Sequence, residues 1–209
     1  MAGVDEVGRG CLFGPVVAAA VILDPARRIR GLNDSKQLAA ERRQELALRI
    51  RDTALAIGVA AVDAARIDQI NIYQASRLAM REAVAALSPA PDCLLVDALT
   101  LDCPLPQRAL IHGDARSISI AAASILAKVE RDSWMEAWDR ALPGYGLARH
   151  KGYGTPEHLE ALARLGPTPL HRRSFAGVAA VCRFPDDVAP YNLELFAAAD
   201  PPWPVPQAS

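Results

Sequence analysis

Two adjacent carboxylates near the start of the chain, Asp5 and Glu6, stand just before the turn sequence Gly8-Arg9-Gly10. Successive side chains of a strand point to opposite faces, so both acids can serve one site only where the strand ends or bends. The two glycines supply such a bend, because glycine adopts backbone angles closed to other residues and lets a ligand approach the main chain. Arg9 offers a forked donor suited to phosphate. The stretch indicates an acid pair beside a phosphate-binding turn, and the alternative is an ordinary strand and turn with two solvated acids.

The composition is that of an ordinary globular chain, with 209 residues of which 51% are hydrophobic and 22% are charged. This length suits one domain with one substantial core. The longest apolar run, Val16 to Leu23, is far shorter than the ~20 residues of a membrane span, and the N-terminus is acidic where a secretory signal would be basic. The cysteines lack the Cys-x-x-Cys spacing, which argues against a zinc site or a disulfide framework and favours reduced thiols in the cytoplasm.

Charge is unevenly distributed, although the formal net charge is only -1. From Arg140 to Arg183 there are seven Arg or Lys residues and two acids, whereas 184–209 contains four acids and no base. A local basic surface can bind a polyanion while the whole molecule stays near neutral. Six prolines lie within 185–209, which is typical of a tail rather than of a packed core.

Hydrophobic periodicity and chain breakers predict alternating strands and helices, and therefore an α/β fold. The predicted strands are Ala2 to Glu6, Val16 to Leu23, Ala54 to Val62, Cys93 to Asp97 and Ala109 to His112. The predicted helices are Ala39 to Arg51, Asn71 to Leu87, Ser117 to Ala141 and Pro156 to Leu165. The first two strands are joined by a short Gly-rich link, which favours antiparallel pairing.

Three further acids mark candidate positions along the chain. Asp97 ends a buried-type strand, where ligand sites of α/β sheets collect, although a strand-end Asp is more often a turn former. Asp114 precedes the long helix and either serves a site or simply caps that helix. Asp132 lies on the long helix beyond Lys128 and Arg131, and we interpret it as part of an exposed charge pair.

Basic residues gather in three segments that could contact a sugar-phosphate backbone. Lys36 lies in the turn before the first helix, and a glycine-flanked loop contains Lys151 and Tyr153. Arg172 and Arg173 form a third group. For Lys36 the competing interpretation is a solvated lysine in a turn, and for Arg172 and Arg173 it is a solvated loop. The histidines are too dispersed along the sequence to predict a transition-metal site, since they occupy positions His112, His150, His158 and His171.

The candidate acids offer only oxygen ligands, which select magnesium or manganese rather than zinc. Two such ions bridged by carboxylates can activate a water and stabilise the leaving oxygen of a phosphodiester, so no protein nucleophile is needed. The sequence therefore indicates metal-assisted phosphodiester chemistry centred on four residues, Asp5, Glu6, Asp97 and Asp114.

The order of these motifs resembles that of a bacterial type 2 ribonuclease H, ribonuclease HII, over roughly residues 2 to 183. The resemblance is carried by Asp5 to Gly10, Gly14-Pro15-Val16, Asp34-Ser35-Lys36, Val96-Asp97, Gly113-Asp114, Ala121 to Asp132, His150 to Tyr153 and His171 to Phe175. It implies a ribonuclease H-like fold, a mixed five-stranded sheet flanked by helices with a C-terminal helical extension. It also divides the chain into one catalytic domain, 1–183, and an acidic, Pro-rich tail, 184–209, which we expect to be flexible.

The resemblance implies a metal-dependent endoribonuclease that cleaves the RNA of RNA/DNA hybrids and cuts on the 5′ side of single ribonucleotides in duplex DNA. The products would carry 3′-OH and 5′-phosphate ends, and the role would be ribonucleotide removal and genome maintenance. The four acids, Asp5, Glu6, Asp97 and Asp114, would hold two Mg²⁺ or Mn²⁺ ions. The ribonucleotide-sensing group would be Gly8, Arg9, Gly10 and Tyr153. Phosphate contacts are expected from Lys36, Lys151, Arg172 and Arg173.

The chain departs from the family pattern at both ends. Only Met1 precedes the first strand, so that strand is short or the true start lies upstream. The tail lacks a complete sliding-clamp peptide, although Leu193 to Phe196 resembles part of one, so clamp contact stays open. The expected partner is a hybrid or a ribonucleotide-containing duplex, with no membrane contact and a monomeric protein. The Gly-Arg-Gly turn separates the chain from the type 3 family, whose corresponding turn differs.

Two other functional classes remain open at this point. A catalytically silent nucleic-acid-binding module would need the basic region without the four acids. A DNA-directed nuclease on the same fold would need the acids without the Gly-Arg-Gly turn or Tyr153. Cleavage of a DNA duplex that contains one ribonucleotide, compared with an all-DNA duplex, distinguishes all three classes.

Overall fold

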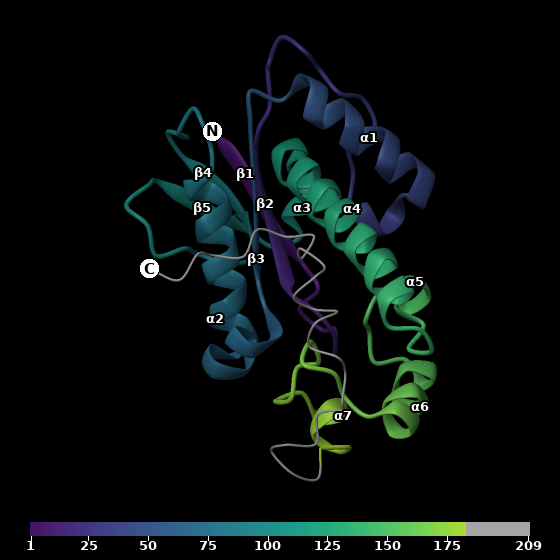
Figure 1. Cartoon of the computed structure of the whole chain (residues 1–209). Coiled ribbons are helices and arrows are strands. Elements are labelled where there is room, and N and C mark those ends of the chain that lie inside the picture. Colours follow the sequence, from purple (N-terminus) through teal and green to yellow (C-terminus); the bar gives the residue numbers. More distant parts are fainter. Residues whose placement is uncertain (183–209) are drawn as a thin grey trace.

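A computed structural model describes residues 1–182 of the chain, and its centre is one mixed sheet with the strand order β3-β2-β1-β4-β5 (Figure 1). Strand β1 (Ala2–Val7) pairs antiparallel with β2 (Val16–Ile22), which pairs antiparallel with β3 (Ala56–Val62). On its other side β1 pairs parallel with β4 (Leu94–Asp97), which pairs parallel with β5 (Gln107–Leu110). The mixed five-stranded sheet and the antiparallel first pair are therefore confirmed.

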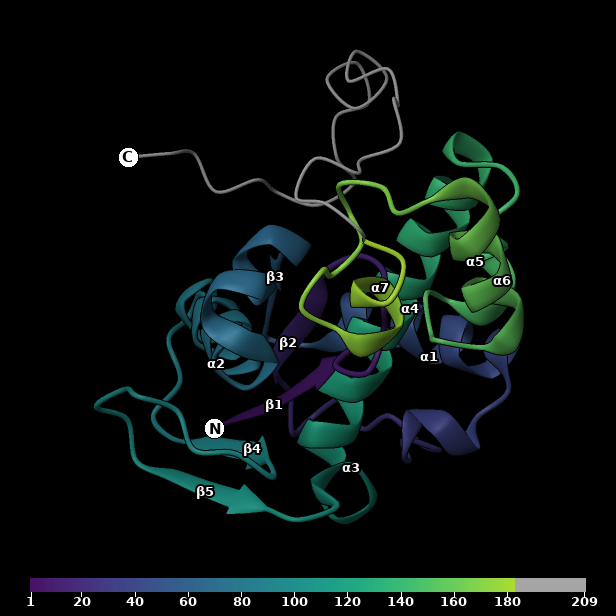
Figure 2. The ribbon, with the colours of Figure 1, turned by 90° about the horizontal axis from the view of Figure 1, so that it is seen from below.

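Helices cover both faces of this sheet, as the two perpendicular views show (Figures 1 and 2). Helix α2 (Ala64–Ala85) packs on one face, and α4 (Ile118–Ala141) with α1 (Ala40–Thr53) packs on the other. The shorter helices are η1 (Ser35–Gln37), α3 (Gly113–Arg116), α5 (Leu147–His150), α6 (Pro156–Leu165) and α7 (Ala176–Ala179). The last three form the helical extension that the resemblance implies.

Strand β2 is buried along its whole length because both of its faces are covered. Val16, Ala18 and Ala20 belong to the cluster on the α2 side, whereas Ala19 and Val21 pack with residues of α1 and α4. A strand covered on both faces has no polar side, so its sequence is a continuous apolar run instead of an alternating one.

Glycines bring helix and sheet backbones close together at two points. A Cβ atom on Gly3 would lie 2.1 Å from the carbonyl carbon of Ser119 in α4. A Cβ atom on Gly58 would lie 2.0 Å from the carbonyl oxygen of Ala83 in α2. The N-terminal part of α4 therefore packs in close backbone contact with β1, the strand that contains the first two candidate acids.

Helix α2 differs most from its prediction, since it begins at Ala64 and not at Asn71. Asp63 caps the true start by accepting a hydrogen bond from the N–H of Arg66 (2.7 Å). Asn71 has a left-handed φ of 64° and kinks the helix, and its side chain accepts from the N–H of Gln74 (3.1 Å). The sequence pattern therefore predicts only the segment after the kink, because the kink at Asn71 interrupts the helical periodicity.

Smaller corrections concern the residues near the predicted site. Lys36 lies in the predicted turn before α1, which forms the short 3-10 helix η1 capped by Asp34. Asp114 lies on its own short helix α3, and Ser117 caps the long helix instead. His112 adopts a left-handed φ of 54°, so the last strand ends two residues before it.

The predictions for 184–209, including the partial clamp-like segment Leu193 to Phe196, lie outside the described residues. Within residues 1–182, no helix combines the length and the apolar character that a membrane span requires.

Candidate active site at the end of strand β1

A cavity of about 290 Å³ opens where β1 ends, and most of the predicted site residues line it. The predicted residues that it brings together are Asp5, Glu6, Gly8, Arg9, Gly10, Lys36, Asp97 and Tyr153. The sequence interpretation did not assign a role in the site to the four other lining residues, Val7, Ser35, Ser124 and Lys128. No local motif distinguishes a serine that packs within a helix interface from one that faces a site, so the position of Ser124 is not apparent from the sequence.

Sheet topology explains why the acids meet. Strands β1 and β4 are parallel neighbours, so their C-terminal ends lie at one edge of the sheet. Asp5 is buried near the end of β1 and accepts a hydrogen bond from the N–H of Glu6 (2.7 Å). Asp97 is the last residue of β4 and accepts from the N–H of Gly113 (2.7 Å). Ser35 and Ser124 share a hydrogen bond of 2.9 Å beside them.

Burial makes ionisation of the acid pair costly. It raises the pKa of Asp5 well above its ordinary value, and the charges of Glu6 and Asp97 add to the rise. Burial also raises the pKa of Glu6, although Arg9 opposes this effect. The guanidinium of Arg9 lies 3.3 Å from one oxygen of Glu6, while the other oxygen is buried and has no hydrogen-bond partner among the described residues. Negative charge in this part of the cavity is therefore compensated only in part, by Arg9.

Asp114 stands beside this group and is not among the residues that line the cavity. It follows Gly113, whose N–H holds Asp97, and its own carboxylate accepts from the N–H of Ala115 (2.9 Å). Burial raises the pKa of Asp114, and the charges of Asp34 and Asp97 raise it further. Asp114 is thus electrostatically coupled to the site.

The two glycines of the turn differ in what they contribute. Gly8 has a left-handed φ of 91°, and a Cβ atom there would lie 2.3 Å from Nε of Arg131. Gly10 does not share the left-handed backbone, and a Cβ atom there would meet only the Tyr153 ring, at 3.9 Å. Gly8 alone therefore requires glycine for the bend, whereas Gly10 leaves open space in front of the Tyr153 ring.

Arg131 holds the segments on both sides of this space. Its side chain is completely buried and donates to three backbone carbonyls, those of Pro15 (3.2 Å), Phe13 (2.9 Å) and Lys151 (2.7 Å). An isolated antiparallel β-bridge, in which Cys11 pairs with Tyr153, joins the same two segments. Tyr153 itself keeps 41% of its surface exposed, so its ring is available to a ligand.

Arg172 is a correction to the predicted phosphate contacts. Its side chain is fully buried and donates to the carbonyls of Gly14 (2.9 Å) and Arg9 (2.9 Å). Burial lowers the pKa of Arg172 to about 9, with a smaller contribution from the neighbouring charge of Arg131. A guanidinium enclosed in this way cannot contact phosphate, because it is fully buried: Nε and Nη1 hold the main chain, and Nη2 is buried without a hydrogen-bond partner among the described residues.

The other predicted bases occupy different surroundings. Lys36 lines the cavity, whereas Lys151 pairs with Glu136 (2.7 Å) outside it. Arg173 is also not among the lining residues, and its backbone N–H donates to Asp68 (2.8 Å).

Asp132 forms the charge pair that its spacing suggested. Lys128 and Asp132 lie 2.8 Å apart, and both side chains are only 16% exposed. The pair is therefore more enclosed than predicted. Lys128 also lines the cavity, so Asp132 is linked to the site through its partner.

Three of the four histidines come together in space, although they are dispersed along the sequence. The rings of His150 and His158 stack at 4.4 Å, and Nε2 of His158 lies 3.2 Å from Nε2 of His171. The fourth histidine, His112, lies at the start of α3. In residues 1–182, no three His, Cys, Asp or Glu side chains form a ready-made metal cage, so neither the histidines nor the acids are preassembled as one.

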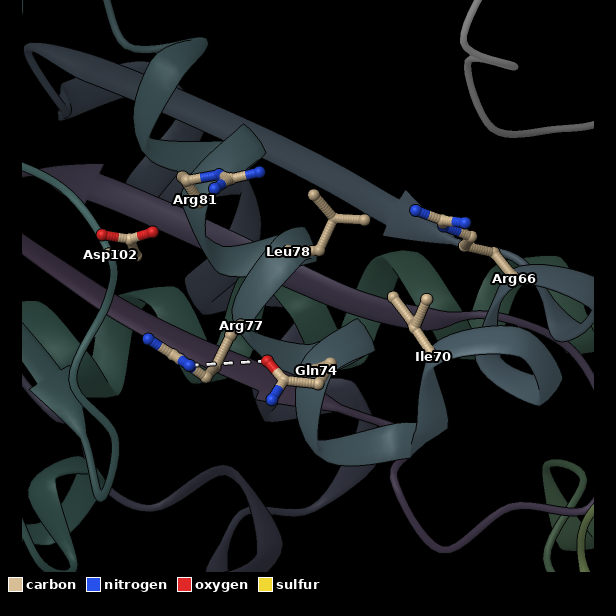
Figure 3. A pocket seen from close by; sticks show the side chains of 7 residues that line it. All are labelled: Arg66, Ile70, Gln74, Arg77, Leu78, Arg81 and Asp102. Carbon is tan, nitrogen blue, oxygen red and sulfur yellow. Dashed lines mark hydrogen bonds between the residues drawn. The ribbon is translucent and has the colours of Figure 1, made fainter.

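A second cavity of about 290 Å³ lies on the outer surface of α2, away from the acids (Figure 3). Arg66, Arg77 and Arg81 surround it, together with Asp102. Arg77 donates to Gln74 (3.4 Å) in the same groove. None of the predicted site residues lines it, so the cavity at the end of β1 remains the candidate active site.

Comparison with known proteins shows the family of this chain. The family model for ribonuclease HII matches residues 2–178. The chain belongs to the ribonuclease HII family. A ribonuclease HII of Solibacter usitatus is 64% identical over 199 residues, which cover 95% of this chain and 87% of that protein. Membership makes the protein a hydrolytic endonuclease with ribonuclease H activity, in a family that depends on divalent metal.

Solved structures of the ribonuclease HII family and its relatives share the fold. The ribonuclease H2 of Pyrococcus horikoshii is 26% identical with a TM-score of 0.73, covering 86% of this chain and 95% of that one. Bst-RNase HIII in complex with Mn²⁺ is 25% identical with a TM-score of 0.67, covering 86% of this chain and 68% of that one. The expected ribonuclease H-like fold is therefore confirmed.

The residues present fit a divalent cation. Asp5, Glu6 and Asp97 offer only oxygen donors, which hard cations prefer. Burial raises the pKa of Asp5 and of Glu6, Arg9 offsets only part of the rise at Glu6, and Glu6 has an oxygen without a partner among the described residues. A cation in this cavity would supply both the charge and the missing contact.

We expect Asp5→Asn to stabilise the metal-free protein at pH 7 while it removes the response to metal. The raised pKa of Asp5 means that the folded state loses stability as pH rises through that pKa, and the neutral amide avoids this loss. The advantage should vanish in acid, where the carboxyl is protonated in both states. Urea denaturation in chelator and in excess Mg²⁺ measures both effects.

Glu45→Gln is the matched control, because Glu45 is an exposed acid whose pKa is lowered by its hydrogen bond to Arg42. This variant should gain no stability at pH 7 and should keep the wild-type response to Mg²⁺. A metal-free Asp5→Asn protein that is less stable than wild type at pH 7 would show that the carboxylate is not destabilising the fold.

Proposed function

We propose that this ribonuclease HII cleaves the RNA of RNA/DNA hybrids and also cuts on the 5′ side of a single ribonucleotide in duplex DNA. The cut would leave a 3′-OH on the DNA and a 5′-phosphate on the ribonucleotide-bearing fragment. One observation carries the proposal: three of the four acids (Asp5, Glu6 and Asp97), Gly10 and Tyr153 line a single cavity. A phosphodiester placed against the acids would therefore have its sugar beside the turn and the ring.

We propose that Asp5, Glu6, Asp97 and Asp114 hold two Mg²⁺ or Mn²⁺ ions in the complex with substrate. When bound, these ions supply an activated water and stabilise the leaving oxygen. The acids themselves provide oxygen ligands and negative charge. Lys36 and Lys128 line the same cavity and attract the phosphate.

Recognition of a lone ribonucleotide depends on one 2′-hydroxyl group. We propose that main-chain groups from Gly8 to Gly10 contact this hydroxyl, since the space beside Gly10 is free of side chains. The Tyr153 ring would stack on the sugar from the opposite side, and its phenol would join the contact. A site with polar groups placed for a hydroxyl discriminates against deoxyribose, because those groups would otherwise stay unpaired.

We propose that residues 1–183 are the catalytic unit, that the protein acts as a monomer in the cytoplasm, and that the tail takes no part in cleavage. The acids, the turn and the Tyr153 loop all lie within residues 5–153. Contact between the tail and a sliding clamp remains a prediction.

Asp97→Asn should reduce cleavage of a DNA duplex with one ribonucleotide by at least about a hundredfold, because a neutral amide holds divalent cations poorly. Asp132→Asn is the control on α4. Its cleavage rate should fall by less than about tenfold, since the Asp132 carboxylate pairs with Lys128. Single-turnover kinetics in Mg²⁺ or Mn²⁺ measure both. Equal losses in the two variants would mean that Asp132 belongs to the metal site, and wild-type cleavage in excess chelator would contradict metal dependence.

Tyr153→Ala should slow cleavage at the single ribonucleotide by about a hundredfold and leave duplex affinity within about threefold of wild type, because overall affinity rests on phosphate contacts. The ring is partly exposed, so its removal leaves the core intact. Cleavage rates in Mg²⁺ and binding in Ca²⁺ separate the two quantities, and an all-DNA duplex serves as the uncut control. If rate and affinity fall together, or if neither changes, Tyr153 is a packing residue.

A further inference from the structure

The three clustered histidines connect the loop of Tyr153 to the end of the described chain. His150 closes α5, His158 lies in α6, and His171 lies in the loop that pairs with Phe13. All three are buried, and none lines the cavity with the acids. Their hydrogen bonds nevertheless lead to Tyr153.

The donors and acceptors around these rings fix which nitrogen carries each proton. The N–H of Thr168 donates to Nδ1 of His171 (2.9 Å), so this nitrogen is unprotonated and the neutral ring carries its proton on Nε2. That proton points to Nε2 of His158 (3.2 Å), which must accept. His158 then carries its proton on Nδ1 and donates it to the carbonyl of Tyr153 (2.9 Å).

Both rings of this chain of hydrogen bonds are neutral near pH 7. Burial lowers the pKa of His158 to about 4 and that of His171 to about 3, and the neighbouring rings contribute to each shift. A second proton on either ring would bring two N–H groups face to face, because Nε2 of His158 and Nδ1 of His171 already accept hydrogen bonds. Each ring therefore keeps a single proton.

His150 fixes the plane of this arrangement. Its Nδ1 accepts from the N–H of Gly152 (3.2 Å), and its Nε2 donates to the carbonyl of Tyr145 (2.7 Å). The ring stacks on His158 with an interplanar angle of 16°. The histidine cluster therefore binds the main chain at two adjacent residues, at the N–H of Gly152 and at the carbonyl of Tyr153.

We infer that His158 and His171 are positioning residues that fix the main chain of Tyr153 and thereby aim its ring at the ribonucleotide. The inference rests on the proposed function of Tyr153. It assigns a role in substrate discrimination to two buried residues that do not touch the substrate. If the cluster served only to fill the core, the direction of its hydrogen bonds would not matter for cleavage.

Two amide substitutions separate these roles at His158. In His158→Asn the amide nitrogen takes the place of Nδ1 and can still donate to Tyr153, whereas in His158→Gln the amide lies at the Nε2 end and that donor is lost. We expect His158→Gln to lower kcat on the single-ribonucleotide duplex by about tenfold with KM unchanged, and His158→Asn to stay within about threefold of wild type. Equal losses in both variants would overturn the inference.

A double-mutant cycle tests whether His158 acts through Tyr153. In the Tyr153→Ala background, His158→Gln should cause little further loss of kcat, whereas fully additive losses would overturn the inference. Nitrogen NMR of the wild-type imidazoles tests the hydrogen-bond chain without any variant: we expect the proton on Nδ1 of His158 and on Nε2 of His171. The reverse tautomers would overturn it. Wild-type cleavage by Tyr153→Ala would instead contradict the proposed function, with the tautomers unaffected.

Discussion

The buried guanidinium of Arg131 is the interaction on which the site depends. Its three hydrogen bonds reach carbonyls of the segment after β1 and of the loop before Tyr153, two stretches that are far apart in sequence. A buried charge is costly unless it is fully hydrogen-bonded, and carbonyl oxygens here take the place of water. Because Gly8 lies directly against this side chain, the turn has no room for a larger residue. One side chain of α4 thus sets the distance between the turn and the Tyr153 loop.

The acids impose the opposite constraint, since their burial opposes folding. The raised pKa of Asp5 shows that its ionised form is poorly accommodated in the metal-free protein. The tightly packed sheet compensates: β2 is buried on both faces, and glycines let the helices approach it and β1 closely. The core therefore supplies the stability with which a site of buried carboxylates can be maintained for catalysis.

Much of this fold and site could be predicted from the sequence because local patterns determine it. The apolar run of β2 and the proline-initiated helix α6 follow from local periodicity and chain breakers. The predicted bounds of α6, Pro156 to Leu165, agree with the structure. The acids Asp5 and Glu6 were assigned to one site because a strand must end beside them, and both line the cavity.

The remaining features depend on tertiary contacts that no local pattern encodes. The basic cluster at Arg172 has the same sequence whether its side chain faces phosphate or carbonyls, and only packing decides. The histidines are separated along the chain, yet α6 and the following loop fold back to stack them. Arg131 likewise looks like a surface base on a charged helix face. A buried cation bound only by backbone carbonyls leaves no sequence signal, because every residue has a carbonyl.

Amide hydrogen exchange in Arg131→Leu tests this account most directly. The N–H of Leu12 donates to the carbonyl of Gly152 (2.8 Å) and so reports whether the turn segment and the Tyr153 loop stay together. If Arg131 holds these segments, the variant should exchange the Leu12 amide at least about tenfold faster while the amides that pair β2 with β3 keep their protection. Unchanged protection at Leu12, or an equal loss throughout the sheet, would contradict the claim that this guanidinium organises the site.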